Sequence, residues 1–177
     1  VQLDEFDQPI HGTTTGSGVI PEIIYANIGE GNEAEDSVTT RTYVANDKNI
    51  LWHGGDEICY YAENLHQMKY RYNGEDGETI AEFTKVSGVP SQTSFQLSRS
   101  YAIYPYGAGG PCTKENTVEK FRVYFTPDQT YTPNSFSKNS NVMIAVGKHS
   151  SDDELYFRNV CGYLVIKLYG AAGTKVK

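Results

Sequence analysis

Short runs in which apolar and polar residues alternate recur along the chain from Ile20 onward, and turn-forming residues separate them. In the clearest run, QMKYRYN, Met68, Tyr70 and Tyr72 fall on one face and the basic residues between them fall on the other. A period of two residues is typical of a β-strand that has one face in a core. Such runs number about nine or ten, at intervals near the 8–12 residues that are usual in β-sandwiches and barrels.

Helical segments are scarce between these runs. Only residues 90–100 suggest a short helix, and no apolar stripe of helical period exceeds roughly two turns. Parallel strands need long crossover connections, usually helical ones. We therefore predict an all-β fold, a mostly antiparallel β-sandwich or flattened barrel with Greek-key-like connections. The other predicted strands lie within residues 21–28, 38–45, 79–86, 100–107, 118–125, 141–147, 155–160 and 162–170.

Residues 1–19 differ from the rest of the chain. They are polar, they have no period, and their QPIHGTTTGSG segment is rich in glycine. This composition predicts a flexible leader or tether. We expect one β domain over residues 20–170, which is long enough to bury a substantial core.

The segment ILWHGGDEICYY, residues 50–61, holds the only tryptophan and raises a choice between a site and a turn. Apolar residues on both sides of the glycine pair predict two strands joined by a tight turn at Gly54–Gly55, with Trp52 largely buried. Asp56 and Glu57 are neighbours and would point to opposite faces of a strand, so they do not suit an acid/base pair. The turn is favoured over a metal or catalytic site built from His53, Asp56, Glu57 and Cys59.

Charge and motifs argue against several function classes. The net charge is −7, with no run of Lys or Arg, so we do not expect a nucleic-acid partner. The acidic clusters lack the spacing of a calcium loop, and we expect neither a metal nor another cofactor. No nucleophile motif is present, so we expect a protein that is not an enzyme.

No apolar stretch reaches the roughly 18 residues of a membrane span, and no signal peptide is visible. The four histidines are scattered along the chain at His11, His53, His66 and His149.

The three cysteines do not have zinc-site spacing. We expect Cys59 and Cys161 to be small buried residues, and Cys112 to be exposed beside the glycine-rich segment 106–111, which we predict to be a mobile loop. Three free thiols are expected, and one disulfide stays open as an alternative if the protein lies in the cell envelope.

Several of these segments, taken in order, resemble a known family. Trp52, Asp56 and Ile58 form a W-x-x-x-D-x-I spacing. TRTY precedes it, and YAIYPY, PDQ and LYFRNVCGYLVIKLYG follow it. In this order the segments resemble the fimbrillin-like (minor-fimbrillin-like, type V pilin-related) surface lipoproteins of gut and oral Gram-negative anaerobes. The resemblance covers about residues 20–170.

The resemblance implies a place and a domain organisation. The chain would be the N-terminal sandwich domain of a protein at the cell surface or outer membrane, and residues 171–177 would start a linker to a possible second domain. The lipid anchor of the family is not present in this chain, whose first cysteine is Cys59.

The resemblance also implies a function, a non-enzymatic adhesion protein that is a fimbrial subunit or a fimbria-associated lipoprotein. Its partners would be like subunits, bound by strand complementation, and an unknown host or bacterial surface ligand. The family's cleavage after an arginine that follows the first strand would fall at Arg41, the first arginine of the chain. Arg41 as an outward-facing strand residue that is never cut stays an alternative.

The 14 tyrosines leave a second function open. Most fall on alternating strand positions, where packing explains them, but tyrosine rings and hydroxyls also suit sugar binding. A surface glycan-binding module of a nutrient-capture system is therefore the alternative function.

Overall fold

Residues 20–28, 50–86, 91–92, 95–130, 136–137, 139–161, 169–171 and 173 are described by the computed structural model of this chain. Within them the elements are β-strands and one turn of 3₁₀ helix, η1 (Tyr106–Ala108). The strands are β1 (Ile23–Ile28), β2 (Glu57–Ala62), β3 (Leu65–Tyr72), β4 (Ile80–Val86), β5 (Ser91–Gln92), β6 (Tyr101–Tyr104), β7 (Gly109–Glu115), β8 (Val118–Val123), β9 (Met143–Val146) and β10 (Glu154–Asn159).

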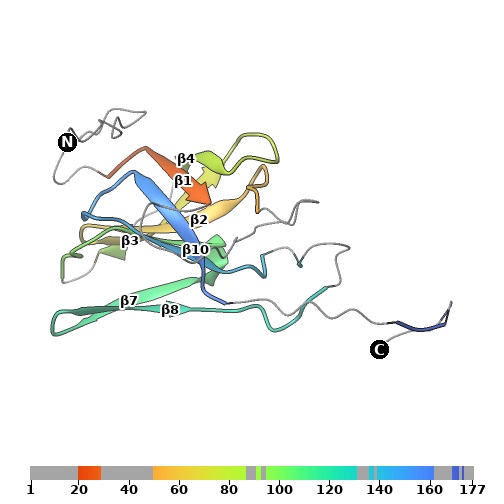
Figure 1. Cartoon of the computed structure of the whole chain (residues 1–177). Helices are drawn as coiled ribbons and strands as arrows, with labels where there is room; N and C mark the ends of the chain where they lie inside the picture. Colours follow the sequence, from red (N-terminus) through yellow and green to blue (C-terminus); the bar gives the residue numbers. More distant parts are fainter. Residues whose placement is uncertain are drawn as a thin grey trace, which may run out of the picture.

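Seven strands close into a barrel in the order β2-β6-β9-β10-β1-β4-β3, because β3 also pairs with β2. All neighbouring pairs are antiparallel except β1 and β10, which run parallel with Tyr25 opposite Glu154. β1 therefore lies between β10 and β4 (Figure 1). The all-β, mostly antiparallel flattened barrel predicted from the sequence is confirmed.

The Greek-key-like connection is found at the start of the chain. β2, β3 and β4 follow one another as antiparallel neighbours, and β1 lies beside β4, which gives the spatial order 1-4-3-2. Three consecutive strands with a fourth added by a long connection define a Greek key.

The barrel interior is an aromatic core centred on Trp52. Its side chain is 0% exposed and makes edge-to-face contacts with Phe83, Tyr104 and Phe157, at ring-centroid distances of 4.9, 5.5 and 5.3 Å. Its indole N–H donates a hydrogen bond to the carbonyl of Ala26 in β1, at 3.0 Å. Edge-to-face pairs add to the free energy of burial, so one side chain links β1, β4, β6 and β10. The burial of Trp52 predicted from the sequence is confirmed.

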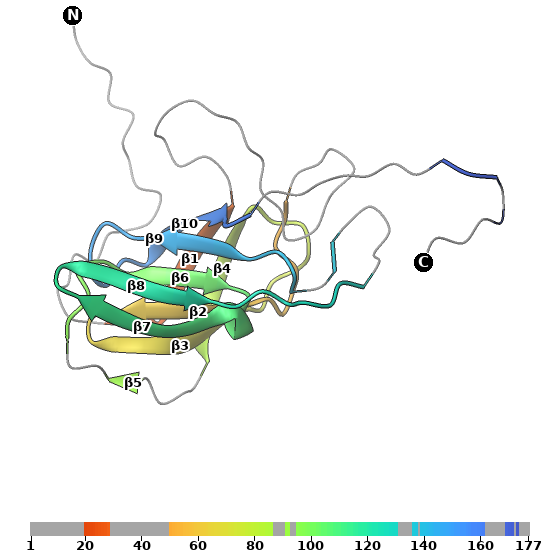
Figure 2. The same cartoon turned by 90° about the horizontal axis from the view of Figure 1, so that it is seen from below.

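A second core lies between the barrel and the β7–β8 hairpin, which forms a separate layer over β2 and β6 (Figure 2). β2 is buried on both faces because alternate residues face the barrel interior and the hairpin. Tyr61 joins the two layers: its ring packs edge to face on Phe121 at 4.9 Å, and its hydroxyl donates to the carbonyl of Gly110 at 2.9 Å. The buried residues of this core are Cys59, Tyr61, Leu97, Ile103, Ala108, Cys112 and Val142.

The glycine-rich segment 106–111 is not the mobile loop that we predicted. It forms η1 and the beginning of β7. Its glycines permit close packing: a Cβ at Gly109 would lie 2.6 Å from the Tyr61 hydroxyl, and one at Gly110 would lie 2.9 Å from the Arg122 carbonyl. The two glycines therefore let β7 approach the barrel closely. Close approach of another chain segment is a common reason for glycine within a strand.

Two of the three cysteine predictions are wrong. Cys112 is 6% exposed because it lies in β7 and faces the second core, whereas Cys161 is exposed beyond the end of β10. Cys59 is buried as predicted. All three are free thiols. Burial raises the pKa of Cys59 to about 12 and that of Cys112 to about 11, so neither forms a thiolate near neutral pH.

The helix suggested at residues 90–100 is also absent from the described part of that segment. Ser91–Gln92 pair with β3, and residues 95–100 have no regular structure. Leu97 is buried in the second core, so packing decides the conformation there.

Other predictions fall outside the described residues: the tether 1–19, the strand at 38–45 with Arg41, and most of 162–170. The described residues contain no helix that is long and apolar enough to cross a membrane.

Candidate functional site

The turn predicted in the tryptophan segment is present. The Asp56 N–H donates to the His53 carbonyl at 2.9 Å, with Gly54 and Gly55 between them. Gly55 has φ +87°, the left-handed region that a residue with a Cβ adopts only with strain. The sequence prediction of a turn at Gly54–Gly55 is confirmed.

The strand pairing around this turn differs from the predicted hairpin. Trp52 forms an isolated antiparallel bridge with Glu78, and β2 pairs with β3 and β6 instead of residues 50–52. The Gly55 N–H donates to the Tyr72 carbonyl at 2.8 Å, which fixes the turn on the end of β3. The turn therefore connects residues 50–52, which lie beside Glu78, to β2, which pairs with β3 and β6.

Substitution of Gly55 by alanine should lower the free energy of unfolding by about 1–2 kcal/mol, the cost of a Cβ in the left-handed region. A Cβ there would meet no atom within 4 Å, so backbone strain is the only cause. Gly107 is the matched control, since its Cβ would also meet nothing within 4 Å and its φ lies outside the left-handed region. Urea unfolding should show Gly107→Ala unchanged or slightly more stable. Equal midpoints for the two variants would contradict this assignment.

Asp56 and Glu57 are each held by protein groups. Asp56 is 7% exposed, and its carboxylate accepts hydrogen bonds from the His53 N–H at 2.9 Å and the Tyr104 hydroxyl at 3.1 Å. Glu57 forms ion pairs with Lys69, at 2.7 Å, and with Arg71. Burial raises the pKa of Glu57, but the hydrogen bonds and charges of these two bases outweigh it and lower the pKa below its ordinary value.

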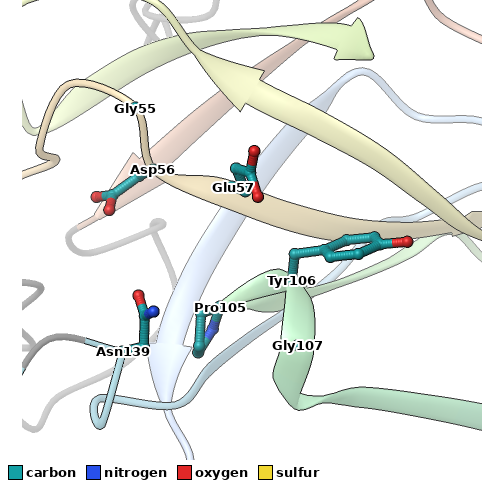
Figure 3. A pocket seen from close by; sticks show the side chains of 7 residues that line it. All are labelled: Gly55, Asp56, Glu57, Pro105, Tyr106, Gly107 and Asn139. Atoms are coloured by element: carbon teal, nitrogen blue, oxygen red, sulfur yellow. The ribbon is translucent and has the colours of Figure 1, made fainter. Parts of the chain in front are cut away.

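The two acids line one open pocket of about 310 Å³ (Figure 3). Three segments build it: the end of the glycine turn with the start of β2, the residues around η1, and the turn before β9. Its lining residues are Gly55, Asp56, Glu57, Pro105, Tyr106, Gly107 and Asn139.

His53 and Cys59, the other two residues of the metal or catalytic site considered from the sequence, do not line this pocket. His53 lies 3.3 Å from Asp76 on the exposed side of the turn, and Cys59 faces the second core. Trp52, Gly54 and Ile58 have structural positions in the core and the turn. Among the described residues, no three His, Cys, Asp or Glu side chains are placed to hold a metal ion.

Tyr106 and Asn139 were not singled out in the sequence. Asn139 has φ +62° in a turn, and the polar SKNS stretch around it is the only local signal that could have drawn attention to it. Neither residue is near Asp56 in the sequence, so only the fold brings them together.

No family model, curated protein or solved structure matches this chain.

Proposed function

We propose that this chain is a non-enzymatic adhesion protein of the cell surface, either a fimbrial subunit or a fimbria-associated lipoprotein. The family comes from the sequence resemblance. The physical support for a subunit is the position of β1, the first strand of the barrel.

β1 is bound on both edges. It pairs antiparallel with β4 and parallel with β10, and it places Ile24, Ala26 and Ile28 in the barrel core. No pairing joins β10 to β4 directly. Loss of β1 would leave two strand edges with unpaired backbone groups and three empty side-chain positions, which favours a replacement strand.

Residues 29–49 connect β1 to the rest of the chain and contain Arg41. A single cut after Arg41 would leave β1 held only by non-covalent contacts. A strand of a second subunit could then occupy its place.

The only tryptophan of the chain reports on this event, because the Trp52 indole donates its hydrogen bond to Ala26 of β1. We expect an arginine-specific protease to cut the folded protein after Arg41. Departure of β1 should then shift Trp52 emission to longer wavelength, and a peptide of residues 20–28 should reverse the shift. Size-exclusion chromatography should show oligomers when no peptide is added.

An Arg41→Lys variant is the matched control, since it keeps the charge and resists the protease. Mass spectrometry locates the cut. A folded protein that stays intact at Arg41 and monomeric, under conditions that cut the unfolded chain there, would exclude assembly by strand exchange.

A second candidate is a surface glycan-binding module. The observation in its favour is the polar pocket, whose lining residues include two acids, an asparagine and a tyrosine. Binding of the intact protein to a glycan array tests it.

A further inference from the structure

We propose that the pocket between the glycine turn, η1 and the turn before β9 binds one uncharged hexose ring of a glycan. This inference rests on the second candidate function and gives it a site. It is independent of any exchange of β1.

The two carboxylates of the pocket are held in place by other protein groups. The Asp56 carboxylate is held by a backbone N–H and a tyrosine hydroxyl, and Glu57 is held between two bases. Carboxylate oxygens accept more than one hydrogen bond each, so these fixed acceptors suit sugar hydroxyls. Binding to a preformed arrangement avoids the entropy cost of ordering the side chains.

Charge balance favours an uncharged ligand. The two negative charges of Asp56 and Glu57 are balanced by two positive charges, those of Lys69 and Arg71, which both pair with Glu57. A cation would compete with these bases for Glu57, and an anion would meet Asp56. A neutral polyol can donate to the carboxylates and needs no counter-charge.

The pocket also offers an apolar surface. Pro105 and the half-buried Tyr106 line it, Tyr106 on the side of Glu57 (Figure 3), and the Lys69 ammonium lies 4.9 Å from the centre of the Tyr106 ring. Sugars present apolar C–H faces as well as hydroxyls, and a tyrosine ring supplies the matching contact. A volume of about 310 Å³ is at the small end of ligand pockets, which suits one sugar ring.

Asn139 completes the rim. It is exposed, and in Figure 3 its amide rises from the turn toward the side of the pocket where Asp56 lies. An amide both donates and accepts hydrogen bonds, so it can donate to the oxygen of a sugar hydroxyl or accept from its O–H group.

The test begins with the intact protein on an array of glycans that end in glucose, galactose, mannose, fucose or N-acetylhexosamines. Calorimetry with the methyl glycoside of the best-bound sugar then compares variants. Asn139→Gly removes the amide and keeps the backbone unstrained, because glycine adopts φ +62° readily. We expect affinity to fall about three- to tenfold, the factor for one neutral hydrogen bond. Tyr106→Leu should weaken binding by a similar factor.

Asn116→Gly is the matched control, since Asn116 also has a positive φ, +56°, at the turn between β7 and β8. It should bind as the unmodified protein does. Unchanged affinity in both Asn139→Gly and Tyr106→Leu, with a positive array, would overturn the pocket but leave the glycan-binding function standing. A negative array would overturn both.

Discussion

Replacement of Trp52 by alanine should lower the free energy of unfolding by about 3–5 kcal/mol, the usual cost of truncating a large aromatic side chain in a core. Trp52 is 0% exposed and contacts three aromatic rings from three strands. Its loss also leaves the Ala26 carbonyl without its indole donor. Because a typical domain is stable by only 5–15 kcal/mol, a large part of the total stability is at stake.

Urea unfolding followed by far-UV circular dichroism measures this effect, since the variant has no tryptophan to follow. Tyr169→Ala is the control, because Tyr169 is 91% exposed and its truncation should change stability by less than about 0.5 kcal/mol. A Trp52→Ala protein that unfolds at the midpoint of the unmodified protein would show that the ring does not form the centre of the core.

Truncation of Tyr61 to alanine should cost a similar amount, about 3–5 kcal/mol, but through the second core. The change removes both the ring contact with Phe121 and the hydrogen bond to Gly110, two of the interactions that bind the hairpin to the barrel. Hydrogen exchange should therefore show greater loss of amide protection in β7 and β8 than in the barrel strands.

Tyr61→Phe separates the two contributions. It keeps the ring and leaves a buried carbonyl without the hydroxyl donor, so we expect a loss of about 1–3 kcal/mol. If Tyr61→Ala weakened protection equally in the hairpin and the barrel, the two cores would not be separate cooperative units.

The sequence predicted the parts of the fold that depend on local alternation. β3 and β4 follow the period of two, and the burial of Trp52 could be predicted from the apolar residues that flank the glycine turn. The pairing of Trp52 with Glu78 could not be predicted in this way, because strand partners depend on long-range packing.

Two of the errors, the mobile loop at residues 106–111 and the exposed Cys112, have a common physical origin. Glycine and proline mark turns in most sequences, so Gly109 and Gly110 suggested a loop, yet here they allow a strand to pack closely on Tyr61. The same error placed Cys112 at the surface. The pocket escaped prediction for a different reason: Asp56, Tyr106 and Asn139 come from separate turns that only the closed barrel brings together.

The parallel pairing of β1 with β10 has a consequence for the order of folding. Tyr25 in β1 pairs with Glu154 in β10, so β1, the first of the described strands, cannot complete its pairing until nearly the whole described chain is available. Contacts between residues so far apart in sequence slow folding, because the chain must close a long loop before it gains their free energy. During synthesis the isoleucine-rich segment IIYANI therefore lacks one of its two partner strands. An unpaired apolar strand is prone to aggregate. Closure of the barrel around β1 therefore has to follow the synthesis of β10.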